Sequence, residues 1–135
     1  MKTVLIVEDD KGISLAMGIR LKAMGYQVES ASDAVTAISQ ARKIDPDVIL
    51  LDIGLPGGDG FVVAERLQQL NQTAVTPIVF ITASKQAGLR ERAMEMGAVR
   101  FIEKPFDATE LADAIESALC PGDEWGIVVT ECRPD

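Results

Sequence analysis

The sequence contains no histidine and only two cysteines among its 135 residues. Without histidine, the chain itself can form neither a histidine-based catalytic triad nor an imidazole metal site. The cysteines, Cys120 and Cys132, are too few for a disulfide framework and lack the spacing of metal ligands. We therefore expect them to be free thiols, as in a cytoplasmic protein.

Positive charge is also scarce, because 13 Lys and Arg residues face 21 Asp and Glu residues, for a formal net charge of -8. This balance argues against direct nucleic-acid binding and against an anionic membrane surface, both of which require clustered cations. The apolar runs are far too short to span a membrane, and Met1-Lys2 leads directly into a strand-like segment without a signal peptide. We expect a cytoplasmic protein, whose acidic balance is compatible with binding a cation.

The pattern of apolar residues predicts strands that alternate with helices. Hydrophobic residues make up 47% of the chain, which is enough for one continuous core. The expected strands are 3–7, 27–30, 48–51, 78–81 and 100–103, and the expected helices are about 13–24, 34–41, 61–70, 86–96 and 107–119. Ser32 or Asp33 is expected to cap the second helix, Asp107 and Glu110 have capping-box spacing, and Asp10 suits a helix cap.

Several expected strands are continuous apolar runs, which is typical of strands buried on both faces. Strands of this kind, alternating with helices, predict an α/β fold in which a parallel five-stranded sheet is doubly wound, with helices on both faces. The domain is expected to occupy residues 1–119. Residues 120–135 form a C-terminal tail containing the apolar segment WGIVV, which suits an added strand or a docking segment.

Polar residues follow four of the apolar strands. Glu8 and Asp9 follow the first, Asp52 the third, Thr82 the fourth, and Lys104 the fifth. Ligands of open parallel sheets bind outside the carboxyl ends of the strands, so these side chains should meet at one edge.

Three carboxylates, a lysine and a hydroxyl form an oxygen-rich set that suits a hard cation, Mg²⁺ above all. Packed carboxylates repel one another unless a cation lies among them. Mg²⁺ and a lysine around a carboxylate are suited to phosphoryl transfer, in which an aspartate can serve as the nucleophile.

In their order along the chain, VLIVEDD, VILLDIGLPGGDG, IVFITA and FIEKPF resemble the motifs of bacterial two-component response-regulator receiver domains, over roughly residues 2–119. The resemblance implies a flavodoxin-like sheet with strand order 2-1-3-4-5. It also implies a single-domain signalling switch that takes a phosphoryl group from a histidine kinase or histidine phosphotransfer protein and then acts on a downstream protein. The phosphohistidine must come from the partner, since this chain has none.

The same resemblance assigns individual roles. It implies Asp52 as the phosphoacceptor, Glu8 and Asp9 as the acidic pair that holds Mg²⁺, and the main-chain carbonyl of Gly54 as a further metal ligand. Thr82 is implied as the hydroxyl that closes on the phosphoryl group, and Lys104 as the cation that pairs with that group. Phe101 is implied as an aromatic switch, and the Lys104–Pro105 bond is implied to be cis. Gly57, Gly58 and Gly60 are interpreted as turn-forming residues, because their spacing matches no phosphate-binding loop.

Two other functions fit the fold. A constitutive interaction module would signal without phosphorylation, although the full set of acidic residues, Thr82 and Lys104 argues against it. A metal-dependent phosphatase would turn over free substrates, but such enzymes usually carry a second aspartate two positions after the nucleophile, where this chain has Gly54. We therefore expect a switch that catalyses only its own phosphorylation and dephosphorylation. As a single domain, it would serve as a phosphorelay intermediate, a partner-binding switch or a phosphate sink, and the sequence also fits a piece of a longer regulator.

Overall fold

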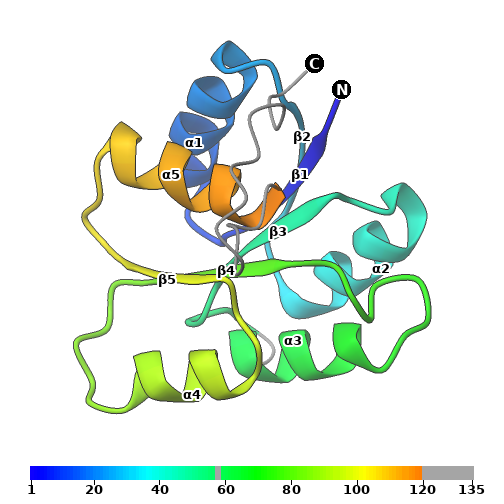
Figure 1. The fold of residues 1–135 in the computed structure, drawn as a ribbon, viewed down its shortest axis with the longest axis vertical. Helices are drawn as coiled ribbons and strands as arrows, with labels where there is room; N and C mark the ends of the chain where they lie inside the picture. The colour runs from blue at the N-terminus through cyan, green and yellow to red at the C-terminus, as the bar shows by residue number, and fades with distance from the viewer. Residues whose placement is uncertain (57–58, 120–135) are drawn as a thin grey trace, which may run out of the picture.

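The computed structural model describes residues 1–56 and 59–119, which form one parallel sheet flanked by helices (Figure 1). The strand order β2-β1-β3-β4-β5 and the parallel pairing confirm the expected topology. In chain order the elements are β1 (Thr3–Val7), α1 (Lys11–Ala23), β2 (Gln27–Ala31), α2 (Ala34–Ile44), β3 (Val48–Asp52), α3 (Gly60–Gln68), β4 (Ile78–Thr82), α4 (Leu89–Glu95), β5 (Arg100–Glu103) and α5 (Ala108–Leu119).

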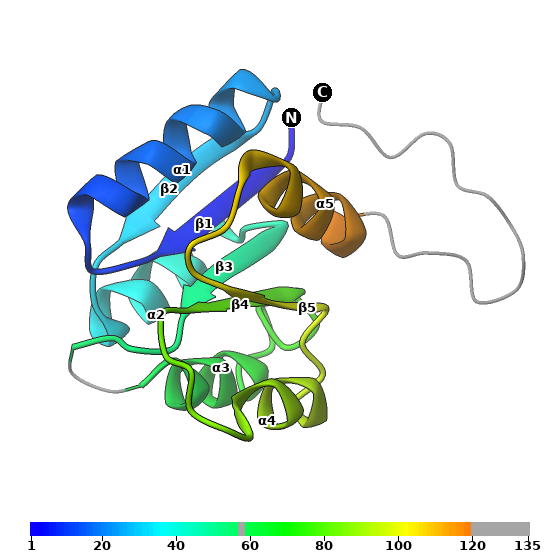
Figure 2. The ribbon, with the colours of Figure 1, turned by 90° about the vertical axis from the view of Figure 1, so that its left-hand side faces the viewer.

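The helices form two layers, with α1 and α5 on one face of the sheet and α2, α3 and α4 on the other (Figures 1 and 2). Each layer has its own core cluster because strand side chains alternate between the faces. Leu5 and Val7 pack in one cluster with Phe61, whereas Val4 and Ile6 pack in the other with Ile115. These two cores confirm the doubly wound α/β fold.

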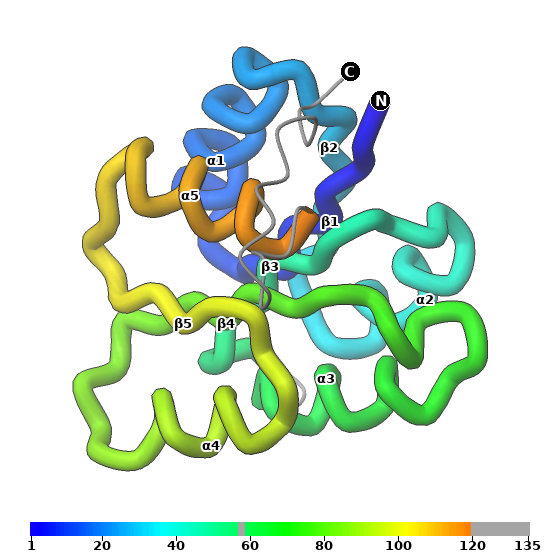
Figure 3. The backbone as a smooth tube through the Cα atoms, in the orientation of Figure 1, coloured from blue at the N-terminus to red at the C-terminus, as the bar shows by residue number. Residues whose placement is uncertain are grey.

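The three central strands, β1, β3 and β4, are almost entirely buried, as their continuous apolar runs predict. The tube in Figure 3 follows the chain back and forth between the sheet and its covering helices. The register pairs Val7 with Leu51, Asp52 with Ile81, and Thr82 with Glu103. The carboxyl ends of the central strands and β5 are therefore level with one another at one edge of the sheet.

Aspartate side chains begin several helices by accepting a hydrogen bond from a main-chain N–H three residues ahead. Asp10 accepts from Ile13 at 3.0 Å and therefore caps α1. Asp33 rather than Ser32 caps α2, and Asp107 accepts from the N–H of Glu110 at 2.8 Å. These caps satisfy N–H groups that have no partner within the helix.

All the helices begin or end a few residues from the expected positions, and α2, for example, continues to Ile44. The helix expected at 86–96 is shorter and begins at Leu89, because Gly88 has a φ of +89° and cannot continue a right-handed helix. The helix expected at 61–70 spans Gly60–Gln68. The Lys104–Pro105 bond is cis, as the resemblance implies.

The C-terminal tail, with Cys120, Cys132 and the WGIVV segment, lies outside the described residues, as do Gly57 and Gly58. Among the helices that are described, none has the length and apolar character needed to cross a membrane.

Candidate functional site

The polar side chains predicted from strand polarity do meet at the carboxyl edge of the sheet. Glu8 follows β1, Asp52 ends β3 and Thr82 ends β4, and these three residues are only 2%, 5% and 2% exposed. Lys104 follows β5 and reaches back toward them. Buried polar residues of this kind require partners, and within the described residues no buried side-chain nitrogen or oxygen lacks one.

Lys104 bridges two of the buried carboxylates. Its Nζ donates a hydrogen bond to Asp52 Oδ2 at 3.0 Å and another to Glu8 Oε1. Burial opposes the positive charge of Lys104, but the hydrogen bonds and charges of Glu8 and Asp52 outweigh burial and raise the pKa of the lysine. Lys104 is therefore a charged ammonium group in contact with the carboxylate of Asp52.

The carboxylate of Asp52 is held at both of its oxygens. Oδ2 accepts from Lys104, while Oδ1 accepts from the N–H of Gly54 at 2.9 Å. The Gly54 carbonyl, expected as a metal ligand, stays a prediction. These two bonds fix the orientation of the Asp52 carboxylate. A carboxylate fixed in this way would require little rearrangement before acting as a nucleophile.

Glu8, Asp9 and Asp52 each present one oxygen within 4.8 Å of the others, which is a spacing that a single metal ion can bridge. Asp9 is exposed, whereas the other two are buried, so one side of the cluster is open to solvent. Asp10 is turned away because its side chain caps α1. The purely oxygen donor set fits Mg²⁺ and would leave coordination positions for water or phosphate.

Burial raises the pKa of Glu8 from 4.5 to about 7, and the neighbouring Asp52 contributes to the rise, while Lys104 partly opposes it. Near neutral pH the metal-free cluster therefore keeps a proton on Glu8 for part of the time. A divalent cation would replace that proton because it supplies the missing positive charge. This response is what a cation site built from crowded carboxylates should show.

Thr82 is connected to Lys104 through the main chain, since the N–H of Lys104 donates to the carbonyl oxygen of Thr82 at 2.7 Å. The Thr82 hydroxyl accepts from the N–H of Ser84 at 3.0 Å. Its hydroxyl hydrogen is therefore free to be donated elsewhere, within the described contacts. This is the property required of a hydroxyl that is to bind a phosphoryl oxygen.

Phe101 lies in the core rather than in the polar cluster, and it is 8% exposed. The guanidinium of Arg90, from α4, lies over the ring at 5.0 Å from its centre, within the range of a cation–π contact. Glu103 is paired with Lys85 at 2.9 Å and lies 3.9 Å from Arg90. The role of Phe101 as a switch stays a prediction.

The residue that sequence reasoning missed is Gly60. It was interpreted as a turn former, but it is the first residue of α3, and a Cβ built there would lie 2.4 Å from the main-chain oxygen of Asp52 and 2.8 Å from Cα of Ile53. The N–H of Gly60 also donates to the oxygen of Ile53 at 2.7 Å. Gly60 thus allows α3 to pack directly against the main chain that carries Asp52. The sequence offers only a glycine after a capping aspartate as a signal.

A family model described as the response regulator receiver domain matches residues 4–116. The chain is similar to RpaA, a DNA-binding dual master transcriptional regulator of Synechocystis sp., with 35% identity covering 88% of this chain and 49% of that protein. It is also similar to the response regulator PleD of Caulobacter vibrioides, with 37% identity covering 96% of this chain and 28% of that protein. The chain thus spans about half, or less, of the length of these relatives.

Solved structures give the same result. The non-phosphorylated receiver domain of HemR from Leptospira biflexa is 33% identical, with a TM-score of 0.81 and coverage of 91% of this chain and 98% of that one. The receiver domain of sensor histidine kinase PA1611 from Pseudomonas aeruginosa is 27% identical, with a TM-score of 0.79 and coverage of 87% and 96%. That structure holds a magnesium ion coordinated in its active-site cleft.

Proposed function

Because this chain belongs to the family of response regulator receiver domains, which are phosphoacceptor switches of two-component signalling systems, we propose that Asp52 is its phosphoacceptor. The observation that carries the proposal is the 3.0 Å contact between Lys104 Nζ and a nearly buried Asp52 carboxylate whose other oxygen is held by Gly54. A turn aspartate with no chemical role would need neither burial nor a lysine.

In the proposed reaction, a carboxylate oxygen of Asp52 attacks the phosphorus of a phosphohistidine on a histidine kinase or histidine phosphotransfer protein. The new O–P bond forms as the P–N bond breaks, and the electron pair of that bond leaves with the imidazole of the partner, which is then protonated by solvent. Lys104 stabilises the negative charge on the transferring group because it is already in contact with Asp52. The product is an acyl phosphate on this chain.

We propose Glu8, Asp9, Asp52 and the Gly54 carbonyl as the residues that would hold Mg²⁺. The convergence of three carboxylate oxygens within 4.8 Å and the raised pKa of Glu8 support this set. When bound, the metal would neutralise oxygens of the phosphoryl group. Glu8 is already bound by Lys104, so Asp9, which is exposed, is the better candidate for direct contact with the ion.

The phosphorylated state would be recognised through Thr82. Its hydroxyl hydrogen can be donated to a phosphoryl oxygen, and its main chain is bonded to that of Lys104, so movement of Thr82 would be felt at the end of β5. Phe101 and the surface formed by α4, β5 and α5 would then change for a downstream protein. The chain would act as a switch and not as an enzyme that turns over a free substrate.

The test is to incubate the chain with Mg²⁺ and acetyl phosphate and to measure its intact mass. We expect a gain of one phosphoryl group, no gain in Asp52→Asn, and a gain in the matched control Asp47→Asn, whose carboxylate lies at the other end of β3. Equal phosphorylation of Asp52→Asn and the unchanged chain would refute the assignment.

A further inference from the structure

The loop between β4 and α4, residues 83–88, is exposed along its whole length. It follows Thr82 directly, so a movement of Thr82 toward a phosphoryl group must carry the loop with it. Gly88, at the far end of the loop, has a φ of +89°, and a Cβ added there would meet nothing within 4 Å. Little packing therefore resists a movement of the loop, and its polar contacts decide where it lies.

Lys85 ties this loop to the end of β5. Its Nζ donates to Glu103 Oε2 at 2.9 Å and to the carbonyl oxygen of Lys104 at 3.4 Å. Within the residues that the structure describes, every hydrogen bond from the loop to β5 or to Lys104 comes from this one side chain. The hydrogen bond and the charge of Lys85, and then the charge of Arg90, lower the pKa of Glu103, so the carboxyl group is ionised at neutral pH.

This tether lies on the side of β4 that faces away from Asp52. One neighbour of β4 is β3, which ends at Asp52, and the other is β5, which ends at Glu103. A loop that follows Thr82 toward Asp52 therefore moves away from Glu103. The Thr82 hydroxyl accepts from the N–H of Ser84, and no hydrogen bond joins it to Asp52 or Lys104 in the described part of the chain. The loop is thus held apart from the carboxylate that it would have to approach.

We propose that the Lys85–Glu103 ion pair is a clasp that holds the β4–α4 loop away from Asp52 in the unphosphorylated chain and opens when Thr82 closes on the phosphoryl group. The inference rests on the proposed phosphorylation of Asp52 and adds a residue that regulates the closure. Lys85 is a positioning residue, because it acts through the loop and does not contact Asp52. Since the clasp stabilises the open state alone, its removal shifts the equilibrium toward the closed state.

Two other charged residues line the cavity of about 210 Å³ beside the clasp. Arg90 Nη2 lies 3.9 Å from Glu103 Oε1, which is too long for a hydrogen bond, and its guanidinium lies over the ring of Phe101. These contacts hold α4, rather than the loop, to β5. Glu91 forms no ion pair among those described, so the clasp depends on Lys85 and Glu103.

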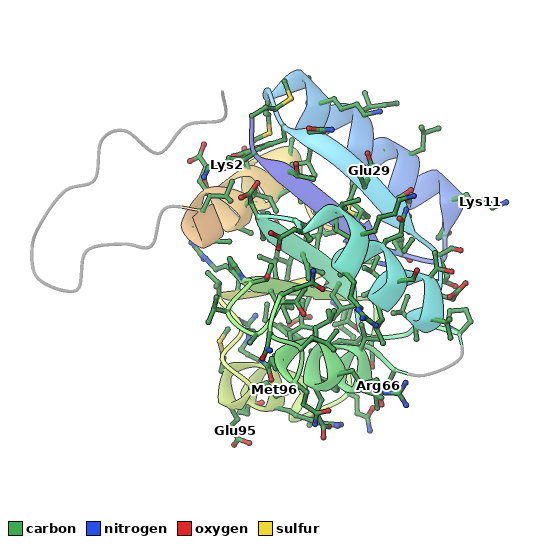
Figure 4. All side chains as sticks on the ribbon, turned by 90° about the vertical axis from the view of Figure 1, so that its right-hand side faces the viewer. Lys2, Lys11, Glu29, Arg66, Glu95 and Met96 are labelled. Carbon is green, nitrogen blue, oxygen red and sulfur yellow. The ribbon has the colours of Figure 1, made fainter. Side chains whose placement is uncertain are left out.

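The far end of α4 is attached to the rest of the domain independently of the loop. Gln68 of α3 donates to the carbonyl oxygen of Met96 at 2.7 Å, and Glu95 and Met96, labelled in Figure 4, mark that end of the helix. Ala93 is fully buried in a core cluster. A movement of the loop can therefore be taken up at Gly88, where the loop meets α4, while the end of α4 stays in place.

The exposure of the clasp limits its strength. The side chains of Lys85 and Glu103 are 67% and 44% exposed, and an ion pair of this kind shifts an equilibrium by at most about fivefold. Salt weakens such a pair, because the screening length falls to about 3 Å at 1 M ionic strength. A contact between uncharged groups would not respond to salt in this way, so the salt dependence distinguishes the clasp from packing.

The test measures the affinity of the chain for beryllofluoride, a tetrahedral mimic of a carboxylate-bound phosphoryl group, with Mg²⁺ present and the amide signal of Ser84 followed by NMR. We expect Lys85→Met and Glu103→Gln to bind it about two- to fivefold more tightly than the unchanged chain at low salt. The double variant should bind no more tightly than Lys85→Met, because both changes break the same pair. In 1 M NaCl these differences should disappear.

The matched control is Glu91→Gln, which removes the same charge from the same cavity and should leave the affinity unchanged. Three results would refute the clasp while leaving Asp52 as the phosphoacceptor: binding by Lys85→Met that is equal to or weaker than that of the unchanged chain, an increase that persists in 1 M NaCl, or an equal increase in Glu91→Gln. If the unchanged chain neither bound beryllofluoride nor gained a phosphoryl group from acetyl phosphate, the proposed function would be wrong, and the clasp with it.

Discussion

Replacing Gly60 by alanine tests whether α3 packs against the main chain of Asp52 as the structure requires. The added Cβ would lie 2.4 Å from the Asp52 oxygen and 2.8 Å from Cα of Ile53, and neither atom belongs to a flexible side chain. The start of α3 or the end of β3 must therefore move. We expect both lower stability and slower phosphorylation, because the displaced main chain carries Asp52, the proposed phosphoacceptor.

The magnitude follows from two opposing effects. Alanine favours a helix over glycine by about 1 kcal/mol, whereas overpacking in a well-packed interior costs about 1–3 kcal/mol. The contacts lie far below van der Waals distance, so we place Gly60→Ala near the upper end, with a net loss of about 2 kcal/mol. For a domain of this size, such a loss lowers the melting temperature by roughly 4–10 °C.

The matched control is Gly18→Ala in α1. There the new Cβ would lie 3.7 Å from Cγ1 of Val28, which is an ordinary contact, so helix propensity alone should act. We expect this variant to be as stable as the unchanged chain or to gain up to about 1 kcal/mol.

Urea denaturation followed by circular dichroism measures the stability of both variants, and intact mass after acetyl phosphate treatment measures phosphorylation. If Gly60→Ala were as stable as Gly18→Ala and reacted at the normal rate, the close approach of α3 to Asp52 would play no part in the site.

Three further predictions concern the charges of the site. In EDTA, the folded state binds the proton of Glu8 more tightly than the unfolded state does. Protonation of Glu8 therefore adds to the free energy of unfolding; this contribution is complete below pH 4.5 and is lost as the pH rises through about 7. Between these pH values the free energy of unfolding, measured by urea denaturation, should fall by roughly 3 kcal/mol. If Glu8→Gln showed the same dependence of this free energy on pH, the prediction would be contradicted. Lys104→Met leaves two buried carboxylates without their cation and should cost about 3 kcal/mol at pH 8 but less at pH 5, where Glu8, with its pKa raised to about 7, is protonated; equal losses at both pH values would count against the bridge. Mg²⁺ at ten times its Kd should stabilise the chain by about 1.4 kcal/mol, an effect that Asp9→Asn should reduce and the exposed control Asp113→Asn should not; an equal gain in all three would mean that the ion binds elsewhere.

Much of the fold could be predicted from local pattern. The buried strands are continuous apolar runs, and a parallel sheet must bring their carboxyl ends to one edge, so Glu8, Asp52, Thr82 and Lys104 could be placed together before any contact was known. Aspartate caps could be predicted because the side chains of Asp10 and Asp33 accept hydrogen bonds from N–H groups only three residues ahead in the sequence. The start of α4 was wrong because Gly88 takes a left-handed conformation there, which glycine permits but does not require, so its presence in the sequence does not reveal it.

The sequence by itself determined which residues lie at the functional edge, because strand polarity and helix alternation are properties of short segments. Only the tertiary structure decided how they act on one another. The pairing of Lys104 with both Glu8 and Asp52 joins residues 96 and 52 positions apart, and the burial that raises the pKa of Glu8 comes from the whole sheet. The same holds for Gly60, whose missing side chain matters only because α3 returns to within contact of Asp52. Contacts between distant segments depend on packing in three dimensions, which no single segment encodes.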